Sequence, residues 1–133
     1  MKTIKTILIA GSLLISSFAM ADQCVDKNGN DIYNTPDVFQ ELISKSENCY
    51  QAAKLAHACA YGSSMDNYTT ALASTVCYNE LKTLPAKKAD LNLLKSMSAR
   101  CQAHFDKDGG TMARSITAFC HLEAVEFIVK LVQ

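Results

Sequence analysis

The sequence predicts an all-α fold, a small irregular bundle of four to five helices cross-linked by disulfides. Three observations support this prediction. After position 35 the apolar residues recur at spacings of three and four, the period of an amphipathic helix, and no alternating strand pattern of any length appears. Six cysteines are present, an even number. The chain also begins with the pattern of an export signal, and exported proteins meet an oxidising compartment in which such cysteines form disulfides.

The N-terminal segment has the three parts of a signal peptide. A short basic region with two lysines precedes the apolar residues 7–18, and Ala-Met-Ala at positions 19–21 is a small-x-small cleavage site. An anchor helix that is not cleaved is the alternative, but the apolar part is shorter than the roughly 20 residues that a membrane span needs. We therefore predict a signal peptide over residues 1–21 and a single disulfide-stabilised domain over residues 22–133. That domain would be periplasmic or secreted, with no membrane span.

The charge and length of the mature chain exclude some functions. Removing 21 of the 133 residues leaves 112, with eleven basic and thirteen acidic side chains and a net charge of −2. Nucleic-acid-binding domains carry a basic patch or a high isoelectric point, so no nucleic-acid partner is expected. A chain of this length forms one domain with a modest core.

A tight turn and then a helix are predicted at the start of the mature chain. Asn-Gly at positions 28–29 is a turn pair between residues 24–25 and 32–33. The segment DKNGND is also similar to a calcium loop, but it lacks the required order of acidic positions before the glycine, so the turn is favoured. Thr35 can cap the helix that follows, and Pro36 suits the first helical position.

The remaining helices are separated by polar or glycine-containing segments. Residues 46–48 either end the first helix or form a polar turn within one longer helix. Thr111 is a plausible cap for the last helix, although Arg114 at the third position leaves the capping box incomplete. Later helices are expected over residues 65–81, 88–104 and 111–132. The positions expected to face the core are Val38, Phe39, Leu42, Ile43, Cys49, Ala52, Ala53, Ala56, Ala60, Met65, Tyr68, Ala71, Leu72, Thr75, Val76, Leu81, Leu91, Leu94, Met97, Ala99, Cys101, Met112, Ile116, Phe119, Cys120, Ala124, Phe127, Ile128 and Leu131.

The six cysteines are expected to form disulfides, for which fifteen pairings are possible. They are Cys24, Cys49, Cys59, Cys77, Cys101 and Cys120. We predict that Cys101 bonds Cys120, because a short Gly-Gly loop can bring their helices side by side. A straight helix would separate Cys49 from Cys59 by about 15 Å, so these two are expected to bond other partners. Histidines near three of the cysteines offer a metal site as the alternative, but no Cys-x2-Cys pair is present, so no metal is predicted.

No catalytic motif is recognisable. The chain lacks a nucleophile elbow, a Gly-rich phosphate loop and an H-E-x-x-H sequence. A pair of catalytic carboxylates could be drawn from Asp66, Glu80 and Glu123, but any chain with thirteen scattered acidic residues offers such pairs, so they do not indicate an active site. The sequence therefore predicts a binding protein without a cofactor and without enzymatic activity. A loop over residues 105–110 is the candidate contact, because Asp106 and Asp108 could meet a basic partner; a solvated turn is the other interpretation.

Three segments together resemble a known family. They are CYQAAKLAHAC at residues 49–59, YTTALASTVCYNEL at residues 68–81, and Cys101 followed by GGTMARSITAFCHLE at residues 109–123. They are similar to the LprI-type lysozyme inhibitor domain of exported bacterial proteins. The chain departs from that pattern at Leu93, where the family has tryptophan, and at Met97-Ser98, where it has Arg-Asp.

The resemblance implies a small exported helical domain, and some members of that family oppose lysozyme. The expected function is therefore that of an inhibitor or immunity-type protein of the cell envelope, which binds and blocks a peptidoglycan-degrading enzyme, either lysozyme-like or an amidase. An envelope or secreted interaction protein with a non-enzyme partner is the alternative.

Overall fold

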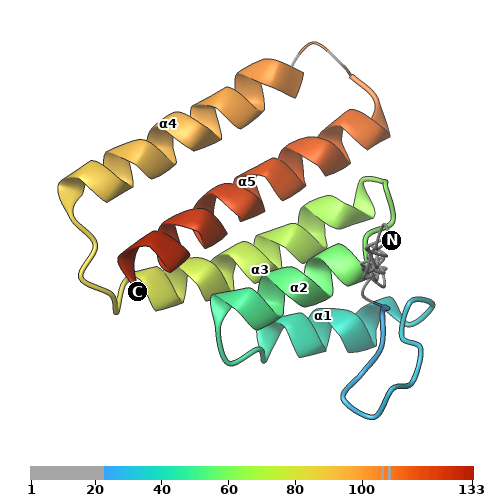
Figure 1. Cartoon of the computed structure of the whole chain (residues 1–133). Coiled ribbons are helices and arrows are strands. Elements are labelled where there is room, and N and C mark those ends of the chain that lie inside the picture. The colour runs from blue at the N-terminus through green and yellow to red at the C-terminus, as the bar shows by residue number, and fades with distance from the viewer. Residues whose placement is uncertain (1–22, 106, 108) are drawn as a thin grey trace, which may run out of the picture.

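Five α-helices follow one another in the computed structural model, which describes residues 23–105, 107 and 109–133 (Figure 1). Within these residues the only β-pairing is one isolated bridge between Val25 and Asp31, so the predicted all-α fold is confirmed. The predicted signal peptide lies outside the described residues. The helices are α1 (Pro36–Ser44), α2 (Cys49–Ala58), α3 (Met65–Leu81), α4 (Lys88–Phe105) and α5 (Thr111–Val132).

Helix α5 lies at the centre of the packing. It contacts α2, α3 and α4, whereas α1 packs on α2 and α3. Among the helices that the structure describes, α4 contacts α5 alone, and Figure 1 shows it at the outer edge of the bundle. Fully burying one large apolar side chain stabilises the fold by about 1.5–3 kcal/mol. The largest apolar side chains that are completely buried are Phe39, Ile43, Leu122, Val125, Ile128 and Val129.

The polar segment between α1 and α2 is a true break. Helix α1 ends at Ser44, and Asn48 has extended backbone angles of φ −153° and ψ 169°. The Asn48 side-chain oxygen accepts a hydrogen bond from the backbone N–H of Gln51, at 2.9 Å. Asparagine is among the best residues for satisfying a free N–H at a helix start, so α2 begins anew here.

Thr35 is the N-cap residue of α1, as predicted, but its side chain makes no capping bond, and the predicted cap at Thr111 is wrong. The Thr35 hydroxyl donates to the Ile32 carbonyl, at 2.9 Å, so it does not accept from a free N–H of α1. Thr111 is the first residue of α5, and Gly110 precedes it in extended conformation without a side-chain cap.

Three disulfides link successive parts of the chain. They join Cys24 to Cys59, Cys49 to Cys77, and Cys101 to Cys120. The third is the pairing predicted from the short loop, and Cys49 and Cys59 bond other partners, as the helix rise requires. Closing loops with separations of 35, 28 and 19 residues stabilises the fold by roughly 3–4 kcal/mol for each bond, if the effect is taken as unfolded-state entropy.

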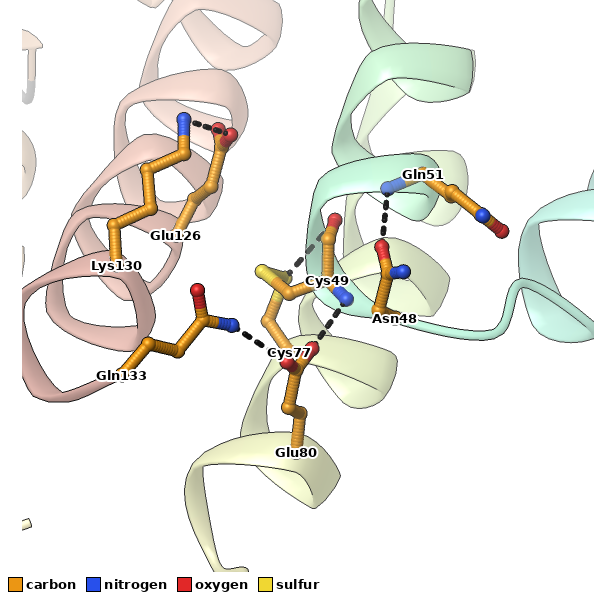
Figure 2. The surroundings of a disulfide bond; sticks show 8 residues. All are labelled: Asn48, Cys49, Gln51, Cys77, Glu80, Glu126, Lys130 and Gln133. Carbon is orange, nitrogen blue, oxygen red and sulfur yellow. Dashed lines mark hydrogen bonds and ion pairs between the residues drawn. A yellow bond between two sulfur atoms is a disulfide. The ribbon is translucent and has the colours of Figure 1, made fainter. Parts of the chain in front are cut away.

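Glu80 joins three helices beside the Cys49–Cys77 bond (Figure 2). One of its carboxylate oxygens accepts from the backbone N–H of Cys49, at 2.5 Å, and the other accepts from the side-chain amide of Gln133, at 2.8 Å. Cys49 is the first residue of α2, so the negative charge lies at the positive end of that helix. Glu80 of α3 thus holds the start of α2 and the end of α5 together.

The buried face of α3 coincides only in part with the one predicted from its apolar residues, because Leu81 is buried and Leu72 and Val76 are partly buried, as expected, but other predicted positions are not. Met65, Tyr68 and Thr75 are exposed, whereas the buried positions are Asp66, Thr69, Thr70, Ala73, Cys77 and Leu81. The threonine hydroxyls donate to backbone carbonyls of the same helix, so they can be buried with their hydrogen bonds satisfied. Hydrophobicity alone therefore identified Leu81 but missed the buried polar positions of α3.

Asp66 is fully buried and connects α3 to α5. Its carboxylate accepts from the backbone N–H groups of Tyr61 and Ser63, at 2.8 and 3.1 Å, and from the hydroxyl of Ser115, at 2.6 Å. Two of these donors belong to the loop before α3, and the third belongs to α5. The carboxylate therefore fixes the α2–α3 loop against α5, and its removal would leave three polar groups without this acceptor.

We predict that Asp66→Ala lowers the free energy of unfolding by about 3 kcal/mol, because one buried and two partly buried donors lose their acceptor, and a buried donor left unpaired costs about 1–3 kcal/mol. Asp90→Ala is the matched control. Asp90 also lies in the first turn of a helix, but its carboxylate accepts one bond, from the Lys87 backbone N–H, at an exposed site. This change is expected to cost about 1 kcal/mol. Urea unfolding of the oxidised proteins measures both values, and equal losses would contradict the role of Asp66.

Candidate functional site

The open side of α5 carries a stripe of large apolar side chains. Met112, Ile116, Phe127 and Leu131 are all exposed, with Met112 at 59% and Phe127 at 48%. Their spacing places them on one side of the helix. The sequence-based expectation that these four residues face the core is therefore wrong. We call this set the α5 stripe.

A groove of about 1000 Å³ runs between α4 and α5. Phe127 of the α5 stripe lines it, and the Cys101–Cys120 disulfide forms part of its wall. Apolar side chains form most of the lining, with Arg100, His104 and Glu123 as the ionisable members. The complete lining consists of Met97, Arg100, Cys101, Ala103, His104, Phe105, Cys120, Glu123, Ala124 and Phe127.

Small residues explain why the two helices leave this space between them. The disulfide holds the Cα atoms of Cys101 and Cys120 5.7 Å apart, which brings the helix backbones close at one point. Ala103 and Ala124 line the groove beside this point, and their single methyl groups do not fill it. On α4 only Leu94 and Cys101 are buried. The groove thus results from a close covalent contact flanked by short side chains.

Helix α2 covers the other border of the α5 stripe. The His57 ring stacks on the Phe119 ring, with 4.7 Å between centroids, and its Nε2 atom lies 3.7 Å from the Glu123 carboxylate. Further along, the Lys130 ammonium lies 5.6 Å from the centroid of the Tyr50 ring. These contacts close the side of α5 that faces α2. The side that faces α4 is left open and forms the groove.

The Asn-Gly segment forms the predicted turn. Gly29 has a φ of 81°, a conformation that favours glycine, and the bridge between Val25 and Asp31 closes the hairpin. The carboxylate of Asp26 accepts from the side-chain amide of Asn30, at 2.9 Å, and from the backbone N–H groups of Asn30 and Asn28. These bonds, led by that from the Asn30 side chain, lower the pKa of Asp26. Its oxygens are therefore occupied by amides of its own loop.

The candidate catalytic and metal-binding residues occupy separate places. Asp66 is in the core, Glu80 holds α2 to α5, and Glu123 lies in the groove. Across the described residues, no three His, Cys, Asp or Glu side chains come together as a metal site requires. All six cysteines lie in the described part of the chain and are paired, so none is a thiolate nucleophile in this oxidised form.

The candidate contact residues Asp106 and Asp108 lie outside the described residues. Phe105, which directly precedes them in the sequence, lines the groove. The groove itself was missed by the sequence analysis. One signal for it was present in the sequence. Apolar residues occur on several sides of α5, and a helix with this pattern packs against more than one neighbour.

The chain matches no protein-family model, no curated protein and no solved structure. Of the helices in the described part, none has the length and apolar character needed to cross a bilayer.

We predict that the groove binds one molecule of an apolar fluorescent dye such as bis-ANS in the oxidised native protein, because open apolar grooves accept such ligands. Ala103→Trp places a large ring at an exposed position of the lining and should weaken dye binding several-fold. Ala71→Trp, at an exposed alanine of α3 outside the groove, is the matched control. Fluorescence titration measures both, and equal affinities in the two variants would place the dye elsewhere.

Proposed function

We propose that this chain is an exported binding protein of the inhibitor or immunity type, which binds and blocks a peptidoglycan-degrading enzyme. The α5 stripe together with the α4–α5 groove is its contact surface. One observation carries this proposal: the domain exposes Met112, Ile116, Phe127 and Leu131 along one side of a single helix, although it has a buried core elsewhere. A row of large apolar side chains of this kind is typical of a protein interface.

The stiffness of the surface supports a binding role. Helix α5 is tied to α3 through Asp66 and Ser115, and to α4 through the Cys101–Cys120 bond. The α5 stripe, held in this way, loses little conformational entropy when a partner binds, so more of the interaction energy is available as affinity. The methionine and aromatic side chains of this surface, Met112 and Phe127, are also of the types enriched at interfaces.

The class of partner follows from three features of the sequence. The signal-like N-terminus would place the mature chain in the compartment that contains peptidoglycan. The resemblance to LprI-type domains, carried mainly by residues 109–123, suggests opposition to a lysozyme. Asp106 and Asp108 directly follow the groove residue Phe105 in the sequence, and carboxylates at that place would favour a basic enzyme.

A partner that is not an enzyme is the second candidate, and one observation favours it. Arg100 and His104 lie on the α4 side of the groove, so this wall is basic. A basic wall would repel a strongly basic enzyme and would suit an acidic protein of the envelope. Both candidates use the same surface, so the enzyme assay distinguishes them.

We predict that the oxidised mature protein inhibits a lysozyme-like muramidase or an amidase, and that Phe127→Asp weakens inhibition by tenfold or more. Burying a carboxylate at the centre of an apolar contact costs at least about 1.4 kcal/mol, which corresponds to tenfold. Tyr68→Asp is the matched control, because Tyr68 is an aromatic residue with 55% exposure on α3 that does not line the groove. Its inhibition constant should change by less than twofold.

Three outcomes can be distinguished by turbidity assays with purified peptidoglycan and a panel of these enzymes. Inhibition that is lost in the Phe127 variant alone supports both the function and the surface. Inhibition that is equally strong in both variants retains the function but contradicts the surface. If the oxidised protein inhibits and retains none of the enzymes, the inhibitor proposal is wrong and the non-enzyme partner is favoured.

A further inference from the structure

The three disulfides have different surroundings. Cys24, Cys59, Cys49 and Cys77 all belong to the buried core. In the third bond Cys101 is buried, but Cys120 is only partly buried, and both cysteines line the α4–α5 groove. We propose that Cys101–Cys120 is a thiol-exchange site, which a dithiol reductant opens through the groove while the two core disulfides stay intact, and that its reduction releases α4 from α5.

Access determines which sulfur is attacked. A thiolate must approach a disulfide sulfur closely, so a bond inside a packed core reacts only after unfolding, whereas a bond at an open groove reacts in the folded protein. Cys120 is the more exposed partner, so the attacking thiolate reaches its Sγ atom. A new bond forms between the reductant sulfur and Cys120, the Cys101–Cys120 bond breaks, and the electron pair leaves on the Sγ atom of Cys101.

The second thiol of the reductant completes the exchange. As a thiolate it attacks its own sulfur in the mixed disulfide, which forms the oxidised reductant and releases the Cys120 thiolate. The two protons given up by the reductant's thiols balance the two taken up by Cys101 and Cys120. The net reaction transfers two electrons from the dithiol to this one bond and requires no other reactant.

Charges of both signs line the groove: Glu123 lies on the α5 side, and the two basic side chains lie on the α4 side with the leaving sulfur. Arg100 and His104 lie on the same wall as Cys101, and the guanidinium is positively charged at every physiological pH. A positive charge close to a sulfur stabilises its thiolate, and a leaving thiolate that is more stable leaves faster. The core disulfides have no arginine in their sequence neighbourhood, since the chain contains Arg100 and Arg114 alone.

The packing of α4 gives the reaction a structural consequence. Helix α4 contacts α5 and none of the other described helices, and Leu94 is its only buried residue apart from Cys101. Cys101–Cys120 is the one disulfide that joins α4 to the rest of the chain. After reduction the remaining contact is the apolar packing along α5, and the loop to α5 contains Gly109 and Gly110. Reduction should therefore let α4 separate and enlarge the exposed apolar side of α5.

Limited reduction tests the site directly. We expect that dithiothreitol added to the native oxidised protein, followed by alkylation with iodoacetamide and peptide mass spectrometry, labels Cys101 and Cys120 at least tenfold faster than the four core cysteines. Labelling of any core pair at an equal or greater rate would overturn the proposal. Arg100→Gln should slow labelling of this pair several-fold, whereas Arg114→Gln, at an exposed arginine of α5 outside the groove, should not. Equal effects of the two would overturn the electrostatic contribution.

A second measurement tests the release of α4. The double variant Cys101→Ser, Cys120→Ser should be cleaved by trypsin after Lys95 and Arg100 at least tenfold faster than the oxidised protein, while cleavage after Lys54 of α2 changes by less than twofold. Circular dichroism shows whether the variant keeps its helical content. Slow cleavage in α4 of a folded variant would overturn the release, and fast cleavage at all three sites would show that the bond supports the whole domain instead.

Discussion

The packing of α5 is the constraint on which the rest of the structure depends. This helix has to fill the core against α2 and α3 and at the same time provide the only helical support that α4 has within the described chain. It is therefore apolar on more than one side. Because α2 and α4 flank it without covering it completely, part of its apolar surface stays exposed to solvent. The α5 stripe and the groove are both consequences of this arrangement.

Polar groups give this small core its specific geometry. Asp66 accepts bonds from the α2–α3 loop and from Ser115, and Glu80 joins the start of α2 to the end of α5. A bundle with an alanine-rich α2 could slide along its apolar contacts at little cost, whereas these directional bonds are satisfied in one arrangement. The two core disulfides also join elements in this part of the domain covalently. The N-terminal part is therefore held by directional hydrogen bonds and by disulfides, whereas α4 is held by one disulfide and its packing on α5.

The sequence was sufficient for the fold class, for the span of α5 and for the Cys101–Cys120 bond, because periodicity, glycine breaks and helix rise are local properties. The buried alanines of α2 were also predicted correctly, since Ala52, Ala53 and Ala56 share one side of a helix with few other apolar residues. The sequence was insufficient to predict the buried face of α3. Thr69, Thr70 and Asp66 are buried there because hydrogen bonds satisfy their polar side chains. The groove could not be predicted, because it depends on which helix α4 packs against, and this is a tertiary property.

Native-state hydrogen exchange of the oxidised protein tests the central claim, that α4 rests on α5 alone, most directly. Amide protons that exchange by local opening report the stability of each segment separately. If α4 has a single helical neighbour, its amides should exchange at least about tenfold faster than those of α3 and the buried side of α5, a difference of about 1.4 kcal/mol in opening free energy. Amides of α4 that are protected as strongly as those of α3 would contradict this account.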